Sequence, residues 1–442
     1  MLAKQPFSRR HFLRTTVGAA AGLSALAPTR LAEIASIADA ASRYSGPFVV
    51  VSDDTWPPGV ANLISQYQKL RPNLQIREAV FGPMEQFPAL FSAARVSGEQ
   101  LDVLMLNGLH SRTYAAAGDL LSLDNKIPYL SRFYPAAVDE ARENGHLYGV
   151  PTSYGGGFLV GYNNAMLAKA GLAEPRSYAD FLHIRDVLRK QGISVFTQAG
   201  RQILAWGAWF FLTYAQTSGN RSLAKTIDTL CGRRTFADPE VVEALQLIFN
   251  FGRDRLFTPG LNSLDFPGAM AEFLTGKAAF YYFGDSQLLN AVRGQHVPNM
   301  DLKLMAMPVL VPDRSVRRQW PGALGWPTCL YAKIAPERVP VALDFVNFIT
   351  SDASNAAILH AASASVGPNI HATGGNDPLF AQVQKLAPDI ALYLNWLWPP
   401  EVDQAFAEGI AAGVAGTKTA LQVARSIQSV FDGLVAKGFT FR

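Results

Sequence analysis

The sequence is poor in the residues that build metal sites and disulfide frameworks. Its 442 residues include two cysteines, Cys231 and Cys329, and seven scattered histidines. There is no CxxC pair and no two histidines stand four residues apart, although zinc sites commonly use such spacings. We therefore expect no metal site. The two cysteines could form one disulfide in an oxidising compartment or remain buried free thiols, and the sequence leaves both alternatives open.

The common catalytic motifs are missing as well. The chain has no Walker A motif, no GxGxxG after a strand, no HExxH and no GxSxG. Ser222 and Lys225 match the SxxK pattern of serine acyl-enzymes, but the partner motifs SDN and KTG are absent, so we interpret this segment as an ordinary helix. Asp53 and Asp54 are adjacent on an extended segment and point to opposite faces, so they cannot flank one glycosidic bond. We expect no cofactor, and a protein that is not an enzyme.

Charge is also scarce, at 17% of residues, and the formal net charge is only +4. Residues 1–32 hold five basic residues and no acidic one, which leaves 34 basic and 35 acidic residues in the rest of the chain. Nucleic-acid binding needs a strong basic field, so a nucleic-acid partner is excluded.

No apolar run is long enough for a stable membrane span. The longest early run, TTVGAAAGLSALA at 15–27, is short, rich in Ala and Gly, and follows SRRHFLR at 8–14. Paired arginines before a modest apolar segment are typical of a twin-arginine export signal, which we assign to residues 1–40. Cleavage could follow Ala27 or Ala40. No cysteine lies between residues 15 and 45, so we expect no lipid anchor and a free periplasmic protein.

The length predicts at least two lobes, since single cores stop growing near about 250 to 300 residues. The run 48–52, FVVVS, predicts a strand buried on both faces, 60–70 a helix, and 74–80 a second strand. This order is a βαβ unit of a parallel sheet. A third strand is predicted at 100–106, followed by a helix at 111–118.

Helices dominate the remainder. The pattern predicts them at 178–191, 205–218, 239–254, 340–350, 351–362, 402–416 and 419–437. Three glycines at 155–157 could form a crossover between lobes or a bulge in a strand, and both alternatives stay open. A second crossover is expected near 305–310.

Several segments together resemble the family 1 extracellular solute-binding proteins of ABC transporters, the maltose-binding-like group. They include NGHLYGVPTSYGGGFLVGYNNAMLAKAGL in the middle of the chain, GKAAFYYFGDSQLL, ALDFVNFITSDASNAAI and the final GTKTALQVARSIQSVFDGL. These stretches follow the family's order over most of residues 48–435. The loop GDSQ departs from the family, which often has a tryptophan there.

The resemblance implies an α/β, two-lobed periplasmic binding protein-like fold of type II, with mixed sheets flanked by helices and joined by a hinge. We expect residues 44–154 and 309–364 in one lobe and 155–308 and 365–442 in the other. The implied function is the periplasmic substrate-binding component of an ABC importer. It would capture a carbohydrate in the cleft between the lobes and deliver it to the permease membrane subunits. We expect a monomer.

In open parallel sheets, ligands collect beyond the carboxyl ends of strands, and sugars need aromatic faces and polar side chains there. The residues that we expect to bind the ligand are Asp54, Trp56, Asn107, His110, Tyr154, Trp206, Trp209, Asp285, Ser286, Trp326, Trp396 and Trp398. Core packing is the alternative for each tryptophan. It is equally favoured for Trp206 and Trp209, which share one helical face.

Two other functions stay open from the sequence. One is an exported binding protein for a polyol or a glycerol-phosphate-type solute. The other is an exported carbohydrate-active hydrolase or lyase.

Overall fold

The computed structural model describes residues 28–53, 59–82, 86–155, 157–284, 300–313, 315–362, 367–372, 378–386 and 389–441. The chain divides into two compact units, residues 1–155 with 324–377 and residues 156–323 with 378–442. The chain therefore passes from one unit to the other three times.

The first unit is an α/β layer structure. Its strands are β1 (Gly46–Ser52), β2 (Leu74–Val80), β3 (Val103–Met105), β4 (Arg142–Glu143), β5 (His146–Leu147), β6 (Gly149–Pro151), β7 (Tyr154–Gly155) and β13 (Pro327–Leu330). Its helices are α3 (Pro28–Ser42), α4 (Val60–Leu70), α5 (Phe87–Ser97), α6 (Gly108–Ala116), α7 (Pro135–Glu140), α15 (Val339–Ile349) and α16 (Asp352–Ala362).

The main sheet of this unit has the order β2-β1-β3-β13-β6. Strand β1 is parallel to β2 and β3, whereas β13 runs antiparallel to β3 and β6. The β-branched run of β1 is buried on both faces, as its continuous apolar pattern predicts, and β2 is the exposed edge strand.

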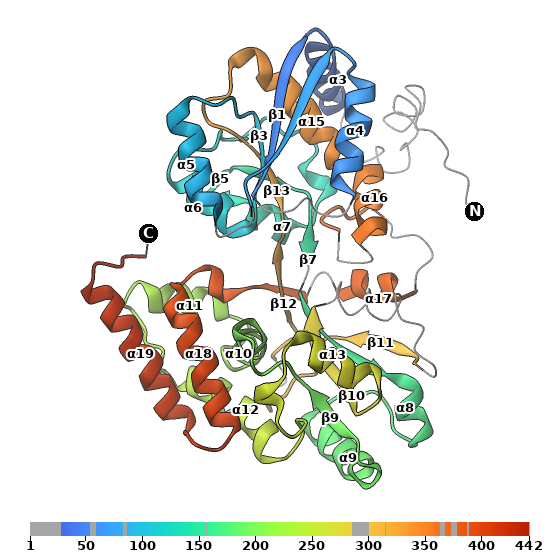
Figure 1. Cartoon of the computed structure of the whole chain (residues 1–442), viewed down its shortest axis with the longest axis vertical. Helices are drawn as coiled ribbons and strands as arrows, with labels where there is room; N and C mark the ends of the chain where they lie inside the picture. Colours follow the sequence, from blue (N-terminus) through green and yellow to red (C-terminus); the bar gives the residue numbers. More distant parts are fainter. Residues whose placement is uncertain are drawn as a thin grey trace. The chain divides into compact units, whose positions relative to one another are not determined.

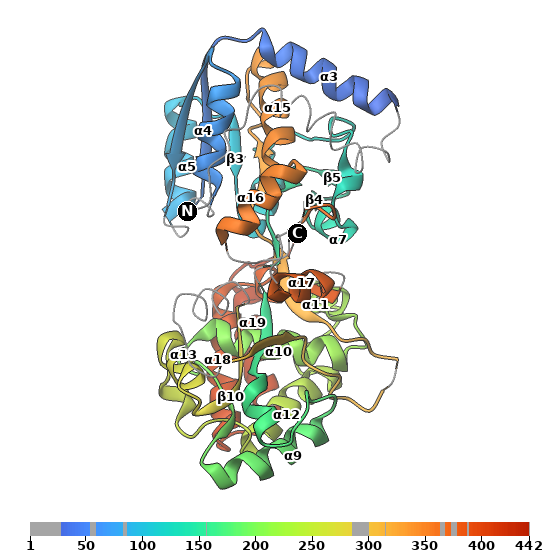
Figure 2. The same ribbon diagram turned by 90° about the vertical axis from the view of Figure 1, so that its right-hand side faces the viewer.

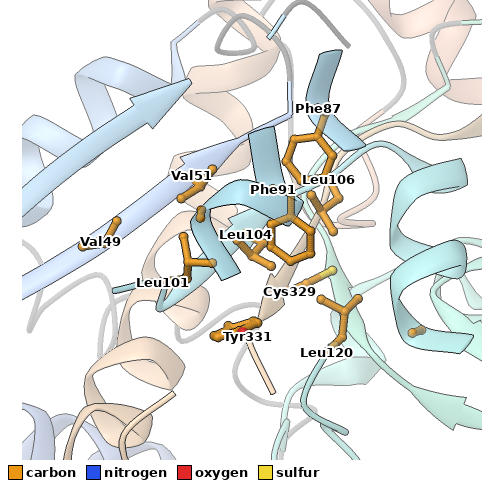
Figure 3. Packing of buried hydrophobic residues seen from close by; sticks show 12 residues of the cluster. Val49, Val51, Phe87, Phe91, Leu101, Leu104, Leu106, Leu120, Cys329 and Tyr331 are labelled. Carbon is orange, nitrogen blue, oxygen red and sulfur yellow. The ribbon is translucent and has the colours of Figure 1, made fainter. Parts of the chain in front are cut away.

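Alternate residues of β1 face two helical layers. Phe48 packs edge-on against Phe345 of α15, with ring centroids 5.9 Å apart. Val49 and Val51 belong to the core on the other face, which Phe87 and Phe91 of α5 complete. Figure 1 shows α5 and α6 on one side of the sheet and α4 and α15 on the other. Figure 3 shows the core around Val49 and Val51 from close by, with the Phe91 ring near Leu104 and Cys329.

Helix α3 packs beside α15 (Figure 2). Its less exposed residues, Ile34, Ile37, Ala38 and Ala41, follow the i, i+3, i+4, i+7 spacing of a single helical stripe. Arg30 near its start donates from Nη1 to the carbonyl oxygen of Pro128 at 3.2 Å.

The second unit is a separate α/β structure. Its strands are β8 (Phe158–Asn163), β9 (Ser194–Thr197), β10 (Ala278–Gly284), β11 (Leu302–Met305), β12 (Trp320–Leu324), which ends at the boundary, and β14 (Ile390–Leu392). Its helices are α8 (Asn164–Lys169), α9 (Tyr178–Leu188), α10 (Ile203–Thr217), α11 (Ser222–Leu230), α12 (Pro239–Arg253), α13 (Phe266–Leu274), α17 (Pro378–Leu386), α18 (Pro400–Val414) and α19 (Ala420–Ala436). Short 3-10 turns in the two units span Leu130–Arg132, Arg189–Gln191, Leu261–Ser263, Pro336–Arg338 and Leu394–Trp396.

The sheet of the second unit has the order β11-β8-β10-β9. Strand β10 is antiparallel to β8 and parallel to β9. Tyr281 of β10 contacts Phe273 of α13, whereas the next residue, Tyr282, faces α10 and contacts Trp209. Helices α10, α12, α18 and α19 pack on one another, as Figure 1 shows.

The boundaries between the units differ in part from those expected. The first crossing falls at 155/156, within the three glycines. The expected crossing near 305–310 is not one, because 309–323 belongs to the second unit. Gln216 of α10 accepts from the backbone N–H of Leu310 at 2.6 Å, and β12 pairs in parallel with β14. The third crossing falls at 377/378 rather than 364/365.

Segment 367–372 accordingly stays in the first unit. The backbone N–H of Ile370 donates to the carbonyl oxygen of Arg132 at 2.8 Å, and that of Tyr134 donates to Pro368 at 3.0 Å.

The two cysteines are free thiols in different units. Cys231 is exposed, and Cys329 is wholly buried in the first unit. Burial raises the pKa of the Cys329 thiol, with a smaller contribution from the Asp53 charge, so this cysteine is unreactive.

Candidate functional site

One edge of the first sheet gathers the ends of four strands. Strands β1 and β3 are parallel and end here, and β13 begins here because its Thr328 pairs antiparallel with Met105 of β3. The end of β6 joins them through the pairing of Pro151 with Pro327. Residues 53, 107, 152 and 326, which flank these strand ends, therefore lie at the same edge. The chain leaves the unit just beyond this edge, at 155, and returns to it at 324.

Asp53, directly after β1, is the centre of this edge and is wholly buried. Its Oδ2 accepts from the backbone N–H of Asn107 at 2.7 Å, from Nδ2 of Asn107 at 2.8 Å and from Nδ1 of His110 at 2.7 Å. Its Oδ1 accepts from Nε1 of Trp326 at 3.1 Å. A buried carboxylate is tolerated when such donors replace its hydration. Asp53 thus accepts hydrogen bonds from two distant segments, residues 107–110 and Trp326.

Asn107 is the N-cap of α6. Its extended backbone (φ −66°, ψ 165°) and the bond from the backbone N–H of His110 to its Oδ1, at 2.8 Å, are typical of that position. Its Nδ2 donates to Asp53. The residue is 7% exposed. The amide that we expected to anchor ligand hydroxyls is therefore engaged in holding the helix start and Asp53.

His110 lies under the same edge and stacks on Phe87 of α5, with centroids 4.9 Å apart and planes at 26°. Because a carboxylate accepts hydrogen bonds, the His110 nitrogen that contacts Asp53 must carry the proton. Nδ2 of Asn107 lies 3.0 Å from the same nitrogen and donates to Asp53 instead. In the neutral ring, Nε2 is then the acceptor.

Trp326 is half-buried at the start of β13. The preceding Gly325 donates its N–H to the carbonyl oxygen of Ser153 at 2.9 Å, and a Cβ at this glycine would overlap the Ser153 side chain. A larger residue here would have to displace the Ser153 hydroxyl, so glycine favours the close approach that brings the indole next to Asp53.

The second unit has a corresponding edge. Strand β8 begins where β10 ends, through the pairing of Phe158 with Gly284, and β9 ends beside β10. Gln198 follows β9 and is wholly buried, yet among the described residues neither polar atom of its amide has a hydrogen-bond partner. A buried amide without hydrogen bonds is costly, so Gln198 is a second candidate for a polar contact with a ligand.

Three of the expected tryptophans lie in the core of the second unit. Trp206, Trp209 and Trp398 are 1%, 0% and 6% exposed. Trp209 contacts Phe251 and Tyr282 with centroids 5.0 and 5.1 Å away. This packing favours the core alternative over sugar stacking for all three.

Trp398 is also fixed through its indole nitrogen. Its ring stacks on Phe406 at 5.2 Å, and its Nε1 donates to Asp403 at 2.8 Å. Burial raises the pKa of Asp403, and the Trp398 hydrogen bond opposes that rise.

Several other expected ligand residues cannot be placed. Asp54, Trp56, Asp285 and Ser286 lie outside the described residues, as do the side chains of Tyr154 and Trp396.

Sequence reasoning missed the role of two residues. The expected ligand contact after the first strand was Asp54, whereas Asp53 is the residue that organises the edge. Gln198 is not among the expected ligand residues. The available signal for both is the same: a polar residue directly after a buried strand.

Within the described ranges, no group of three or more His, Cys, Asp or Glu residues is placed to hold a metal ion. The helices of those same ranges include none that is both long and apolar enough to cross a membrane.

The sequence pattern of the bacterial extracellular solute-binding proteins matches residues 62–373, well over half of the chain. The chain belongs to this family. Members of the family bind solutes and are not enzymes, so the present solute-binding protein is a receptor. No curated protein matches it by sequence.

Solved structures share its fold at low identity. A family 1 extracellular solute-binding protein from Bifidobacterium longum subsp. infantis has a TM-score of 0.76 at 14% identity, over 88% of this chain and 99% of that one. Apo RafE from Streptococcus pneumoniae has a TM-score of 0.75 at 15% identity, over 88% and 98%. The bacterial solute receptor AcbH has a TM-score of 0.74 at 17% identity, over 89% and 99%. The expected two-lobed periplasmic binding protein fold is thereby confirmed.

Proposed function

We propose that this solute-binding protein captures a carbohydrate and delivers it to the membrane subunits of an ABC importer. The observation that carries the proposal is the edge of the first unit, where the half-buried Trp326 donates from its indole nitrogen to the buried carboxylate of Asp53, which also accepts from His110. Sugars present flat C–H faces, which stack on aromatic rings, and hydroxyl edges, which need fixed polar partners.

The solutes of structurally similar proteins support the same class. AcbH has an exclusive preference for β-D-galactopyranose, RafE has been solved with raffinose, and MalE3 of T. maritima with maltose. We propose that the solute contacts residues of both units and stabilises a closed state by its differential affinity for that state. The receptor acts as a monomer.

Export through the twin-arginine route is part of the proposal. The paired Arg9 and Arg10, the modest apolar run behind them and the absence of cysteine at 15–45 support a periplasmic protein without a lipid anchor. Replacing both arginines with lysine should retain the precursor in the cytoplasm. Normal export of that variant would contradict this route.

A thermal-shift screen tests the solute class. Galactose, maltose, raffinose and chitin oligosaccharides should include at least one sugar that raises the melting temperature, since a ligand at 100 times its Kd stabilises by about 2.7 kcal/mol. Polyols and glycerol phosphate form the comparison set. A shift with that set and none with any sugar would replace the carbohydrate by a polyol or glycerol-phosphate-type solute.

A further inference from the structure

The carboxylate of Asp53 joins the end of β1 to two other parts of the first unit that are far apart in sequence, residues 107–110 and Trp326. Asn107 follows β3, His110 lies in the first turn of α6, and Trp326 precedes β13. All three donate to Asp53, at distances from 2.7 to 3.1 Å. We propose that Asp53 is a positioning residue for ligand recognition: it holds the Trp326 indole as the aromatic platform on which the sugar stacks. This inference rests on the carbohydrate function proposed above.

A second buried carboxylate in the same sheet shows what a purely structural role looks like. Asp102 precedes β3 at the opposite end of that strand and is also wholly buried. Its partners are the Arg338 guanidinium at 2.7 Å, the backbone N–H of Val49 at 2.8 Å and the Gln100 amide at 2.7 Å. The positive charge of Arg338 compensates its burial.

Among the residues that the structure describes, Asp53 has no such guanidinium partner. Throughout the described chain, no Lys or Arg nitrogen lies within 4.0 Å of its carboxylate, and its side-chain partners are an amide, an imidazole and an indole. The partner nearest to a counter-charge is the His110 imidazole, 2.7 Å from the Asp53 carboxylate, which is a cation only when it is protonated. The partners that it selects are instead the aromatic and polar groups at the edge where β1 and β3 end.

The bond to Trp326 restricts the indole in two ways. An indole has a single N–H donor, so fixing it to Asp53 sets both the rotation of the ring and which edge of it is turned inward. The remaining ring surface is then oriented before any ligand arrives, which lowers the conformational cost of stacking. The bond to His110 orients its ring in the same way, and in the neutral ring it leaves Nε2 as an acceptor.

The first arm of the test needs no ligand. The seven tryptophans give separate indole resonances in a protein labelled with 15N-tryptophan, and Trp326→Phe identifies that of Trp326. The Asp53 carboxylate accepts four hydrogen bonds through two oxygens, and the amide in Asp53→Asn keeps only one oxygen as an acceptor. The Trp326 resonance should shift and exchange with solvent at least tenfold faster, while the other six stay in place. Asp102→Asn is the matched control and should leave the Trp326 resonance unchanged.

The second arm measures binding of galactose, maltose and raffinose by calorimetry. For the sugar that the unaltered protein binds, Trp326→Ala and Asp53→Asn should each raise Kd at least tenfold. The double variant should bind little worse than Trp326→Ala, because Asp53 acts through the indole. Asp102→Asn should keep Kd within twofold, even where it lowers stability.

The outcomes separate this inference from the proposed function. If the unaltered protein binds a sugar but Trp326→Ala binds it equally well, or Asp53→Asn leaves the indole resonance unmoved, the positioning role is wrong and the carbohydrate function stands. If no sugar binds the unaltered protein, the carbohydrate function fails and the sugar platform with it. If Asp53→Asn does not fold, Trp326→Phe takes its place in the binding experiment. Trp326→Phe removes the hydrogen bond to Asp53 and keeps an aromatic ring. Unchanged affinity in Trp326→Phe would overturn the positioning role.

Discussion

The hydroxyl of Tyr67 donates to Oδ2 of Asp344 across 2.7 Å and so ties α4 to α15 through a buried carboxylate. Arg71, the C-cap of α4, donates from Nε to the same oxygen at 3.0 Å. Burial raises the pKa of Asp344 above its ordinary value, and the charge of Arg71 opposes this rise. The two helices cover the face of β1 that carries Phe48, so the trio anchors one layer of the first unit.

Arg71→Met should destabilise the first unit by about 3 kcal/mol at pH 7, because it leaves the Asp344 charge buried without its partner. An acid whose pKa is raised in the folded state gives stability at low pH that is lost as the pH rises above its unfolded value of 3.8. The loss of stability caused by Arg71→Met should therefore be at least 1 kcal/mol smaller at pH 4 than at pH 7. Urea unfolding at both pH values measures this. Arg77→Met, which breaks the exposed pair with Glu99, is the control and should cost under about 0.5 kcal/mol.

Arg338→Gln should cost about 3 kcal/mol at neutral pH. Arg338 donates to a carboxylate oxygen of Asp102, which is wholly buried and would keep only neutral donors in the variant. Guanidinium unfolding followed by far-ultraviolet circular dichroism measures the loss. A cost below about 1 kcal/mol would mean that the backbone and amide donors alone compensate the charge.

Much of the local structure follows from the sequence. The expected bounds of 60–70 and 74–80 are those of α4 and β2, and 239–254 differs from α12 by one residue. Strong hydrophobic periodicity and clear breakers, such as the proline after α4, determine these elements locally. Tertiary context was not needed for them.

The crossings and the site depend on contacts that periodicity does not encode. The apolar run 305–310 resembles a chain passage, but the side chain of Gln216 holds it on α10. Asp53 gains its role only because β13 enters antiparallel beside β3 and brings Trp326 to it. Two tryptophans on one helical face could either pack in the core or contact a ligand. The burial of Trp206 and Trp209 favours core packing.

Asp124→Asn should destabilise the protein at pH 7 but not near pH 2. The backbone N–H of Leu147 and then Nδ1 of His146 lower the pKa of Asp124 to about 2. An acid with a lowered pKa gives stability above its unfolded value, 3.8, that is lost as the pH falls to about 2. Since the carboxylate is 32% exposed, screening keeps the cost at pH 7 under about 1 kcal/mol. Equal costs at pH 7 and pH 2.5 in denaturant titrations would contradict this assignment.

Gly413→Ala should cost about 1 to 3 kcal/mol. A Cβ at Gly413 in α18 would overlap the ring of Phe249 in α12, and both residues lie in a packed interface between these helices. Gly433→Ala in α19 is the matched control. Its Cβ would meet nothing within 4 Å, so better helix propensity should stabilise the protein by about 0.5 to 1 kcal/mol. Thermal unfolding of the two variants should therefore shift in opposite directions.

Trp209→Phe should lower stability by about 2 kcal/mol and keep sugar affinity within twofold. The Trp209 ring is fully enclosed by Phe251, Tyr282 and other core side chains, so the smaller ring leaves a cavity in the second unit. Calorimetric binding at a temperature where the variant is folded separates the two effects. Because Trp326→Phe makes the same substitution at the edge of the first unit, the contrast with that variant isolates position from residue type. A Kd raised tenfold in Trp209→Phe, with stability unchanged, would return Trp209 to the ligand site.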